Sequence, residues 1–216
     1  MMPTRRLLVA LVATVAVIGG CEGPGLIAQA LFPEKIPAVY DLPDRSTAVI
    51  VDDPQHLLGR RGGADAVTAS AHFHLSENNA VRRTVEPGDV ANLRHELGDA
   101  YPTTAIDRLG RLLGVRQVVH VRIVQVHFGA NPGMLRPEAV VRVKVIDVEA
   151  SRRLFPDPDQ VGASHTLKIK MGAHPQRNEG TAEKEALRRR LAGRIGRDVA
   201  RLFYRHLPRQ PGEPME

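Results

Sequence analysis

The sequence of 216 residues contains one cysteine, Cys21, and no tryptophan, and only 4% of its residues are aromatic. A single cysteine excludes an intramolecular disulfide, so no covalent cross-link can stabilise the fold. With so few large aromatic side chains, the hydrophobic core must be built from Val, Leu, Ile and Ala. The sequence therefore predicts a core that depends on close packing of small and branched side chains.

The common catalytic motifs are also missing. The chain has no GxSxG, no SxxK and no GxxxxGK[ST] segment, which are the patterns of nucleophilic hydrolases and phosphate-binding loops. We therefore expect a protein that is not an enzyme and holds no cofactor. A hydrolase is the alternative, and it would need convergent acids or a Ser–His pair.

The histidines do not predict a metal site. His72 and His74 fall about 200° apart on a helix, and His120 and His127 fall on opposite phases of one strand. A structural zinc site needs four convergent ligands. We therefore expect no bound metal.

The amino-terminal segment has the pattern of an export signal. Arg5 and Arg6 precede an apolar run, 7–18, which two small residues separate from Cys21. This run is too short for a membrane-spanning helix, which needs about 20 residues, but it suits a secretory signal. We predict a signal peptide over 1–20.

The segment Ile18-Gly19-Gly20-Cys21 resembles the bacterial lipobox. The resemblance implies diacylglyceryl attachment to Cys21, cleavage before it, and acylation by palmitate-type chains. Two or three chains give stable anchoring, whereas one gives marginal binding. In some enterobacteria, lipoproteins that stay in the inner membrane carry Asp directly after the cysteine. Because this chain has Glu22 there, the resemblance favours the outer membrane, with the protein facing the periplasm. The alternatives are an ordinary secreted protein with a free cysteine, and a protein whose amino terminus is itself anchored in the membrane.

The net charge limits the choice of partner. The formal charge of +6 falls to +4 once Arg5 and Arg6 are removed with the signal. A basic balance is typical of nucleic-acid binding, but export separates the protein from nucleic acid. The expected partners are the membrane, through the anchor at Cys21, and an envelope protein or anionic polymer.

Proline spacing and hydrophobic periodicity predict a single domain. Residues 21–46 should form a proline-rich tether, 47–207 one domain, and 208–216 a disordered tail. Expected strands lie at 47–52, 80–85, 118–128, 138–148 and 165–171, and expected helices at 62–77, 87–97, 102–113 and 181–206. A change of phase along 118–128 predicts a bulge or a strand buried on both faces.

The order of these elements is β-α-β-α-α-β-β-β-α. It predicts an α/β fold of the α+β sandwich type, in which a mixed sheet of about five strands has its helices packed mainly on one face.

The sheet face opposite the helices is predicted to be basic. Polar residues alternate with inward apolar residues on three adjacent strands; they are His120, Arg122, Arg142, Lys144, Lys168 and Lys170. Such a face can hold an anionic ligand or an acidic partner, and the alternative is an ordinary solvated face. A concave, apolar-lined pocket beside Arg142 and Lys168 would favour a small ligand, and a flat face a protein or polymer.

Two further features have two interpretations each. Asp52 and Asp53 end the first strand, where they can bind a ligand or cap the following turn. The arginine-rich last helix can lie on a membrane or pack its apolar stripe on the sheet with the arginines in solvent.

The strand 48–51, the segment 114–119 and the strand end 145–147 resemble the small periplasmic α/β domain of three families. These are the amino-terminal part of TolB, the penicillin-binding-protein activator LpoB, and the curli secretion lipoprotein CsgG. Segments 36–44 and 51–54 also resemble uncharacterised lipoproteins of planctomycete-type bacteria. That second resemblance implies a family without an assigned function, so no functional residue is carried over.

These observations predict a lipid-anchored accessory protein of the cell envelope that binds another envelope component without catalysis. The alternative is a binder of a small anionic ligand or cell-wall polymer on the basic sheet face.

Overall fold

The computed structural model describes residues 34–59, 62–131, 134–159, 164–175 and 181–208. The predicted signal peptide, Cys21 and the tail from 209 onward lie outside the described residues. The described chain forms two units, 37–205 and a small one that joins 34–36 to 206–208. In the small unit Ile36 and His206 form an antiparallel bridge, in which each amide donates to the other's carbonyl at 2.8 and 3.1 Å.

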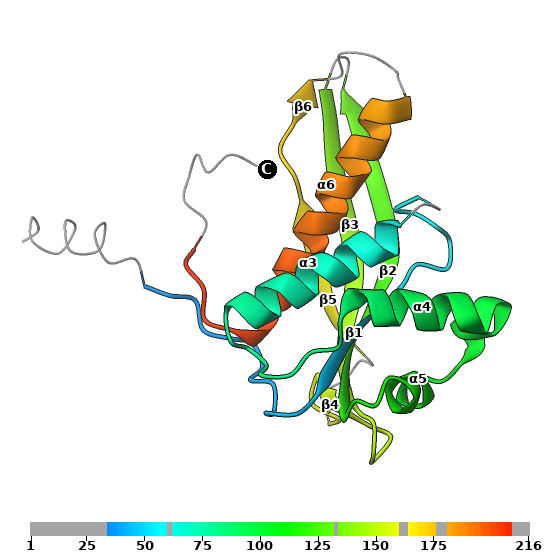
Figure 1. The fold of residues 1–216 in the computed structure, drawn as a ribbon. Coiled ribbons are helices and arrows are strands. Elements are labelled where there is room, and N and C mark those ends of the chain that lie inside the picture. The colour runs from blue at the N-terminus through cyan, green and yellow to red at the C-terminus, as the bar shows by residue number, and fades with distance from the viewer. Residues whose placement is uncertain (1–33, 60–61, 132–133, 160–163, 176–180, 209–216) are drawn as a thin grey trace, which may run out of the picture. The chain divides into compact units, whose positions relative to one another are not determined.

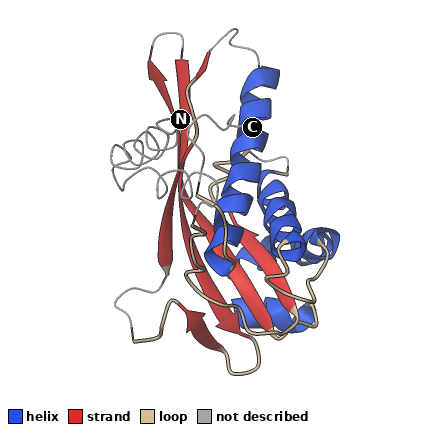
Figure 2. Cartoon of the chain, turned by 90° about the vertical axis from the view of Figure 1, so that its left-hand side faces the viewer, coloured by secondary structure: helices blue, strands red, loops and turns tan. Residues whose placement is uncertain are grey.

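The larger unit is built on a mixed sheet (Figures 1 and 2). Its strands are β1 (Thr47–Asp52), β2 (Gln117–Asn131), β3 (Met134–Asp147), β4 (Arg152–Phe155), β5 (His165–Lys170) and β6 (His174–Pro175). β1 pairs with β2 in parallel, and β2 pairs with β3 antiparallel. The other edge of β3 is shared in turn by β4, β5 and β6, all antiparallel. β3 is therefore central, and three short strands complete its outer edge.

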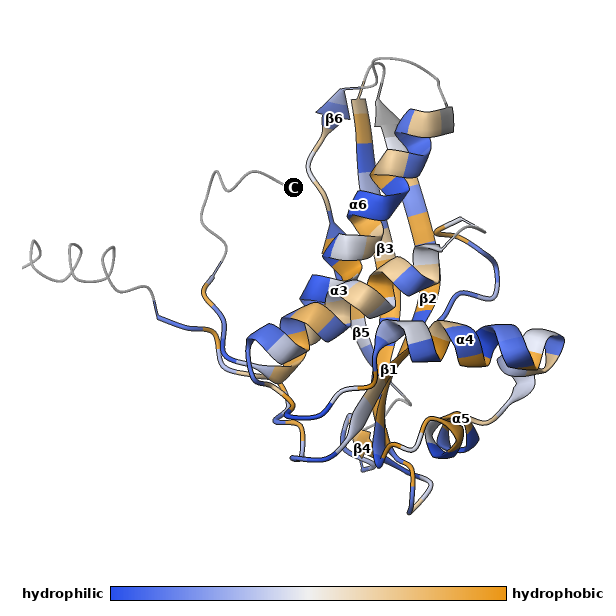
Figure 3. Ribbon diagram, viewed as in Figure 1, coloured by the Kyte–Doolittle hydropathy of each residue, from blue (hydrophilic) through white to orange (hydrophobic). Residues whose placement is uncertain are grey.

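Four α-helices lie in the described ranges. They are α3 (Gly63–Glu77), α4 (Pro87–Leu97), α5 (Ile106–Leu112) and α6 (Thr181–Ala200), with 3₁₀ turns at Gly98–Thr103 and Arg201–Phe203. None of them is both long enough and apolar enough to cross a bilayer. Hydrophilic and hydrophobic residues alternate along α3 and α6 (Figure 3), as expected of helices with one buried face.

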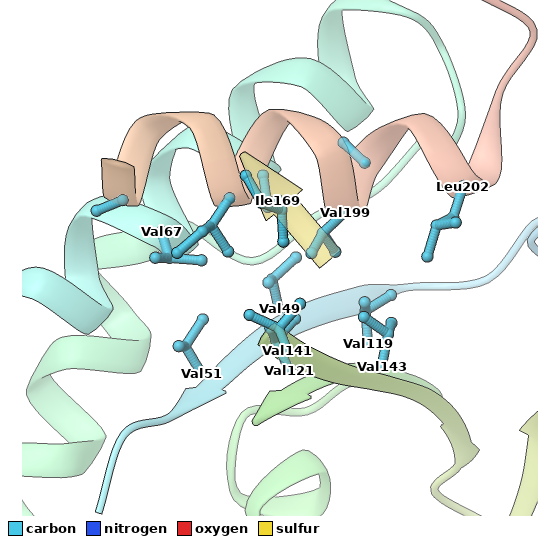
Figure 4. Packing of buried hydrophobic residues seen from close by; sticks show 14 of the residues in the cluster. Val49, Val51, Val67, Val119, Val121, Val141, Val143, Ile169, Val199 and Leu202 are labelled. Carbon is cyan, nitrogen blue, oxygen red and sulfur yellow. The ribbon is translucent and has the colours of Figure 1, made fainter. Parts of the chain in front are cut away.

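The main core lies between one face of the sheet and the helices α3 and α6. Alternate residues of β1, β2 and β3 are fully buried there, including Val49, Val51, Val119, Val121, Val141 and Val143 (Figure 4). Val67 of α3 and Val199 of α6 pack on them. Burying a side chain of this kind contributes about 1.5–3 kcal/mol, so the core that the composition predicts is the main source of stability.

A second, smaller core lies on the opposite face. Ala48, Ile50 and Val118 point to this side and pack against Val90 of α4 and Leu109 of α5. Because these helices contact only β1, the beginning of β2 and the end of β3, no described helix covers the rest of this face.

A bulge lies in the middle of the β2–β3 ladder. The register shifts between Ile123 and Gln125, so Val124 is an extra residue on β2. Both Ile123 and Val126 consequently face the main core, which explains the change of phase in the sequence. Beyond the bulge, β2 and β3 continue past β1 beside the first turns of α6, with β5 and then β6 on the outer edge of β3 (Figure 1).

The predicted fold class and the helices on one face are confirmed, with α4 and α5 added on the other face. The expected strand at 80–85 is wrong, since only Thr84 forms a bridge, to Thr47. The short link between the end of α3 and Pro87, which starts α4, leaves too little chain for a longer ladder. Two strands, β4 and β6, were not predicted, because such short polar segments carry little hydrophobic alternation.

The crossing of α3 and α6 requires glycine at one position. A Cβ atom on Gly196 would lie 2.6 Å from the Val67 carbonyl oxygen and 2.7 Å from the Ala71 nitrogen. One turn away, a Cβ on Gly193 would meet nothing within 4 Å. The Ser70 hydroxyl also donates a hydrogen bond to the Gly193 carbonyl at 2.7 Å. The two helix backbones are therefore in direct contact at Gly196.

We predict that Gly196→Ala lowers the free energy of unfolding by about 1–3 kcal/mol, because the two helices must separate to admit the methyl group. The control Gly193→Ala should stabilise the protein by about 0.5–1 kcal/mol, since alanine is the better helix former. Urea denaturation of both variants measures the difference. Equal effects from the two substitutions would contradict the close crossing.

Candidate functional site

The six residues of the predicted basic sheet face do share one face. In the ladder, His120 pairs with Lys144 and Arg122 with Arg142, and each lies between residues buried in the main core. On β5, Lys168 and Lys170 flank the buried Ile169. Because side chains alternate along a strand, these residues all point away from α3 and α6. These six residues form the basic sheet face.

Most of the basic sheet face is open. The side chains of Arg122 and Lys170 are 57% and 69% exposed, and Arg142 and Lys168 are also exposed. His120 is the exception at 8% exposure, because it pairs directly with Ile50 at the margin of the second core. The face therefore has a covered margin at His120 and an open area over β3 and β5.

Two carboxylates partly balance this charge. Asp52 lies 3.7 Å from Arg122, and Glu138 lies 3.4 Å from Lys170. Such exposed pairs are worth about 0–1 kcal/mol each. Among the described residues, Arg142 and Lys168 have no carboxylate within ion-pair distance. The middle of the face is thus the part with uncompensated positive charge.

Burial and neighbouring positive charges both lower the pKa values of the residues at the covered margin. Burial, together with Lys144 and Arg122 nearby, lowers the pKa of His120 from 6.5 to about 3. Partial burial, Arg122 and Arg153 lower the pKa of Lys144, and Asp52 opposes this shift. His120 is therefore neutral at pH 7, and it contributes no charge to the face.

A depression of about 310 Å³ lies at the far end of the face, beside Lys168. It is lined by Gln125, His127, Glu138, Ala139, Val140, Lys168, Ile169 and Lys170. Its side chains are mainly polar, and Arg142 is not among them. The apolar-lined pocket that would favour a small ligand is not found beside Arg142 and Lys168 in the described part of the chain.

The bulge places two polar residues on this face that the sequence pattern did not assign to it. Gln125 pairs with Val140 and His127 with Glu138, on the same face as Arg142. Simple alternation puts His120 and His127 on opposite faces, but the extra residue at the bulge brings them to the same one. The change of hydrophobic phase along 118–128 is the sequence signal that could have placed these two residues on this face.

At the end of β1 the two aspartates have different environments. The two carboxylate oxygens of Asp53 accept hydrogen bonds from the amides of Leu57 and Leu58 at 2.9 and 3.0 Å, so Asp53 caps the turn. Partial burial raises the pKa of Asp52, an effect that Arg122 opposes. Only Asp52 remains available to a ligand.

A cavity of about 440 Å³ adjoins Asp52. Its wall includes the end of β1, the first turn of α3, and Arg94 and Tyr101 from α4 and the turn after it. The Arg94 guanidinium is held by an ion pair with Asp65, by the Val51 carbonyl and by the Tyr101 ring, 5.2 Å away. This site is separate from the open middle of the basic sheet face, and Asp52 lies between them.

The remaining candidate residues have structural partners. His72 shares a hydrogen bond with Thr84 at 2.7 Å, and His74 lies 3.5 Å from Glu77. The described residues contain no group of three or more His, Cys, Asp or Glu that could hold a metal.

The last helix packs on the sheet. Its apolar residues are buried in the main core; they are Leu187, Leu191, Ile195 and Val199. Arg194 is buried beside Asp198 at 2.9 Å, while Arg189 and Arg190 are exposed. The apolar stripe is therefore used for core packing and is not available to a membrane.

Comparison with known proteins identifies no family. No protein-family model matches the chain, and no curated protein matches it. Similar solved structures include lipoprotein GNA1162 from Neisseria meningitidis, with 13% identity, TM-score 0.42, and coverage of 66% of this chain and 91% of that one. A minor lipoprotein from Acinetobacter baumannii has 8% identity and TM-score 0.40, covering 74% and 92%.

The LpoB carboxyl-terminal domain from Salmonella enterica has 12% identity and TM-score 0.35, covering 67% and 93%. These structures are bacterial proteins with a similar α/β arrangement. With every TM-score below 0.5, the similarity assigns neither a family nor a function to this chain. The resemblances to TolB, CsgG and planctomycete-type lipoproteins stay predictions.

The neutral state of His120 predicts a pH-dependent stability. Between pH 6.5 and about 3 the unfolded chain binds a proton at this histidine that the folded chain does not. The free energy of unfolding should therefore fall as the pH decreases through this range, by about 1.4 kcal/mol per pH unit from this group. His120→Gln should remove about 2 kcal/mol of the loss between pH 7 and 5, measured by urea denaturation.

The control for this measurement is His95→Gln, because His95 is exposed on α4. It should leave the pH dependence of the wild type unchanged. A His120→Gln variant with the same pH dependence as the wild type would show that His120 can be protonated in the folded state.

Proposed function

We propose that this protein is a lipid-anchored, non-catalytic binding protein of the cell envelope, which holds another envelope component against the open middle of its basic sheet face. The observation that carries the proposal is the uncompensated charge of Arg142 and Lys168 on a part of the sheet that no described helix covers. An acidic surface brought against these side chains gains Coulomb energy and is attracted from a distance.

The anchor supports the same proposal. The lipobox-like segment ending at Cys21 would attach acyl chains and confine the domain to a membrane surface. Confinement raises the effective concentration of the domain near any partner bound to that membrane. A modest affinity at the basic sheet face is then enough. Glu22 favours the outer membrane, with the domain in the periplasm.

The surroundings of the face favour binding over chemistry. The carboxylates that pair with this face, Asp52 and Glu138, lie beside Arg122 and Lys170. In the ladder Arg122 is opposite Arg142, four residues along β3 from Glu138. The two carboxylates balance charge there and do not converge on a common point, as an acid–base pair for hydrolysis must.

A small anionic ligand or an anionic cell-wall polymer is the second candidate for the same face. It is favoured by the polar depression beside Lys168 and Lys170, whose ammonium groups suit a carboxylate or phosphate.

The test is crosslinking of the full-length protein in its native membrane, followed by identification of what copurifies. We expect a specific envelope protein with the wild type, and its loss in Cys21→Ala, which cannot be lipidated. Arg142→Glu with Lys168→Glu should reduce the recovered partner at least about tenfold, because two favourable charge interactions become repulsive.

The matched control is Arg189→Glu with Arg190→Glu, which makes the same charge change on the exposed side of α6. This variant should retain the partner. Equal loss in both double variants would assign the effect to net charge and contradict a role for the basic sheet face. Recovery of polymer or small anions alone would support the second candidate, and full function in Cys21→Ala would overturn the anchored mechanism.

A further inference from the structure

The two sides of the sheet end in different kinds of edge. At the β1 edge, the Thr47 amide donates to the Arg83 carbonyl and the Thr47 carbonyl accepts from the Val85 amide, both at 2.9 Å, and residues 47–51 are buried. On the other side, β5 pairs with β3, and none of the described strands pairs with the far side of β5. β5 is therefore the longest open edge of the described sheet.

The hydrogen bonds of β5 show which of its residues face this open edge. The Met171 amide, directly after β5, donates to the Pro137 carbonyl of β3 at 2.9 Å. In an antiparallel ladder only every second residue is bonded to a given neighbour, so the odd-numbered residues of β5 bond to β3. The residues between them direct their N–H and C=O groups away from β3; they are Thr166, Lys168 and Lys170.

These outward groups are free to pair with another chain. Thr166, Lys168 and Lys170 are exposed, and their backbone groups have no hydrogen bond with a described residue on the open side. Each residue supplies one donor and one acceptor. An extended segment of about five residues is long enough to pair with all of them, so the edge can accept an additional strand.

The side chains along the edge determine which strand fits. Lys168 and Lys170 lie on the basic sheet face, and Arg142 lies on the same face beside Thr166 in the ladder. A residue placed opposite Lys168 would share this face, at a Cβ separation of about 4.5–5.5 Å. On the other face the half-buried Leu167 packs at the margin of the main core. The edge therefore suits a strand in which acidic and apolar residues alternate.

The same lysines disfavour other occupants. Lysine on an edge strand discourages pairing with uncharged or basic strands. A two-fold pairing of two β5 edges that uses all three outward residues would put Lys168 opposite the same lysine of the second copy, and like charges placed directly opposite are destabilising. Charge thus selects an acidic segment over a second copy of this chain.

We propose that the envelope partner binds through an extended acidic segment, which adds to β5 as an antiparallel strand and places acidic side chains on alternate residues beside Lys168 and Lys170. This inference rests on the proposed function and specifies how the partner meets the basic sheet face. The antiparallel direction is chosen because it is slightly more stable per residue than the parallel one. Main-chain hydrogen bonds would give affinity, and the alternating side chains would give specificity.

Fluorescence anisotropy of the full-length protein in detergent tests this proposal with a labelled peptide, Glu-Val-Glu-Val-Glu-Val. We expect it to bind at least about tenfold more tightly than Glu-Glu-Glu-Val-Val-Val, which has the same charge without the alternation, and than Lys-Val-Lys-Val-Lys-Val. In the proposed register the glutamate amides point to β5. N-methylation of these amides should weaken binding at least about tenfold, and N-methylation of the valine amides should leave it within about threefold.

Thr166→Pro tests the edge of the protein itself. It removes an outward N–H without changing the charge, and proline is tolerated in edge strands where the N–H faces solvent. We expect peptide binding to weaken by about three- to tenfold, the effect of one lost hydrogen bond, while thermal unfolding stays cooperative. Lys168→Glu should weaken binding at least about tenfold, and Lys184→Glu, the same change at an exposed position of α6, should bind like the wild type.

Three results would overturn the proposal. They are no binding of the alternating peptide, equal binding of the two N-methylated peptides, and a dimer of the free protein that Thr166→Pro dissociates, which would assign the edge to a second copy. If any of these occurred while crosslinking still recovered a partner that Arg142→Glu with Lys168→Glu releases, the proposed function would stand and only strand addition would be wrong.

Discussion

The antiparallel pairing of β2 with β3 is the interaction on which the rest of the larger unit depends. It is the longest ladder in the described chain, running from Gln117 opposite Asp147 to Asn131 opposite Met134. β1 is added to one edge, and β4, β5 and β6 are added to the other. The pairing also decides which residues face α3 and α6. If it slipped by one residue, the buried valines would move to the solvent side and the cations into the core.

Unequal coverage of the two faces follows from this arrangement. α3 and α6 bury one face of β1, β2 and β3, but α4 and α5 reach only β1, the first part of β2 and the last part of β3. The uncovered part is where strands carry arginine and lysine at alternate positions. The protein therefore has an ordinary α/β core on one side, and an open charged surface on the other that a second molecule can approach without any rearrangement of the backbone.

Asp52 connects the two candidate sites. It is the last residue of β1, its carboxylate lies beside Arg122 of the basic sheet face, and it also lines the cavity with Arg94 and Tyr101.

The sequence by itself determined the positions of the main elements and the composition of the core. The periodicity of Val119, Val121 and Val143 is local, and it predicts a buried strand face whatever the topology. It also placed Arg142 and Lys168 on the opposite face. Only the tertiary structure decided how much of that face α4 and α5 cover, because helix docking depends on contacts between distant residues such as Val90 and Ile50.

The same reason applies to the bulge and the cavity. A single extra residue at Val124 moves His127 to the face of His120, and its position depends on the register with β3. Asp52, Ala64 and Tyr101 are far apart in the sequence, and no spacing rule brings them together. They meet because β1 lies between α3 on one face and α4 on the other. The cavity at its end therefore exists only in the folded chain.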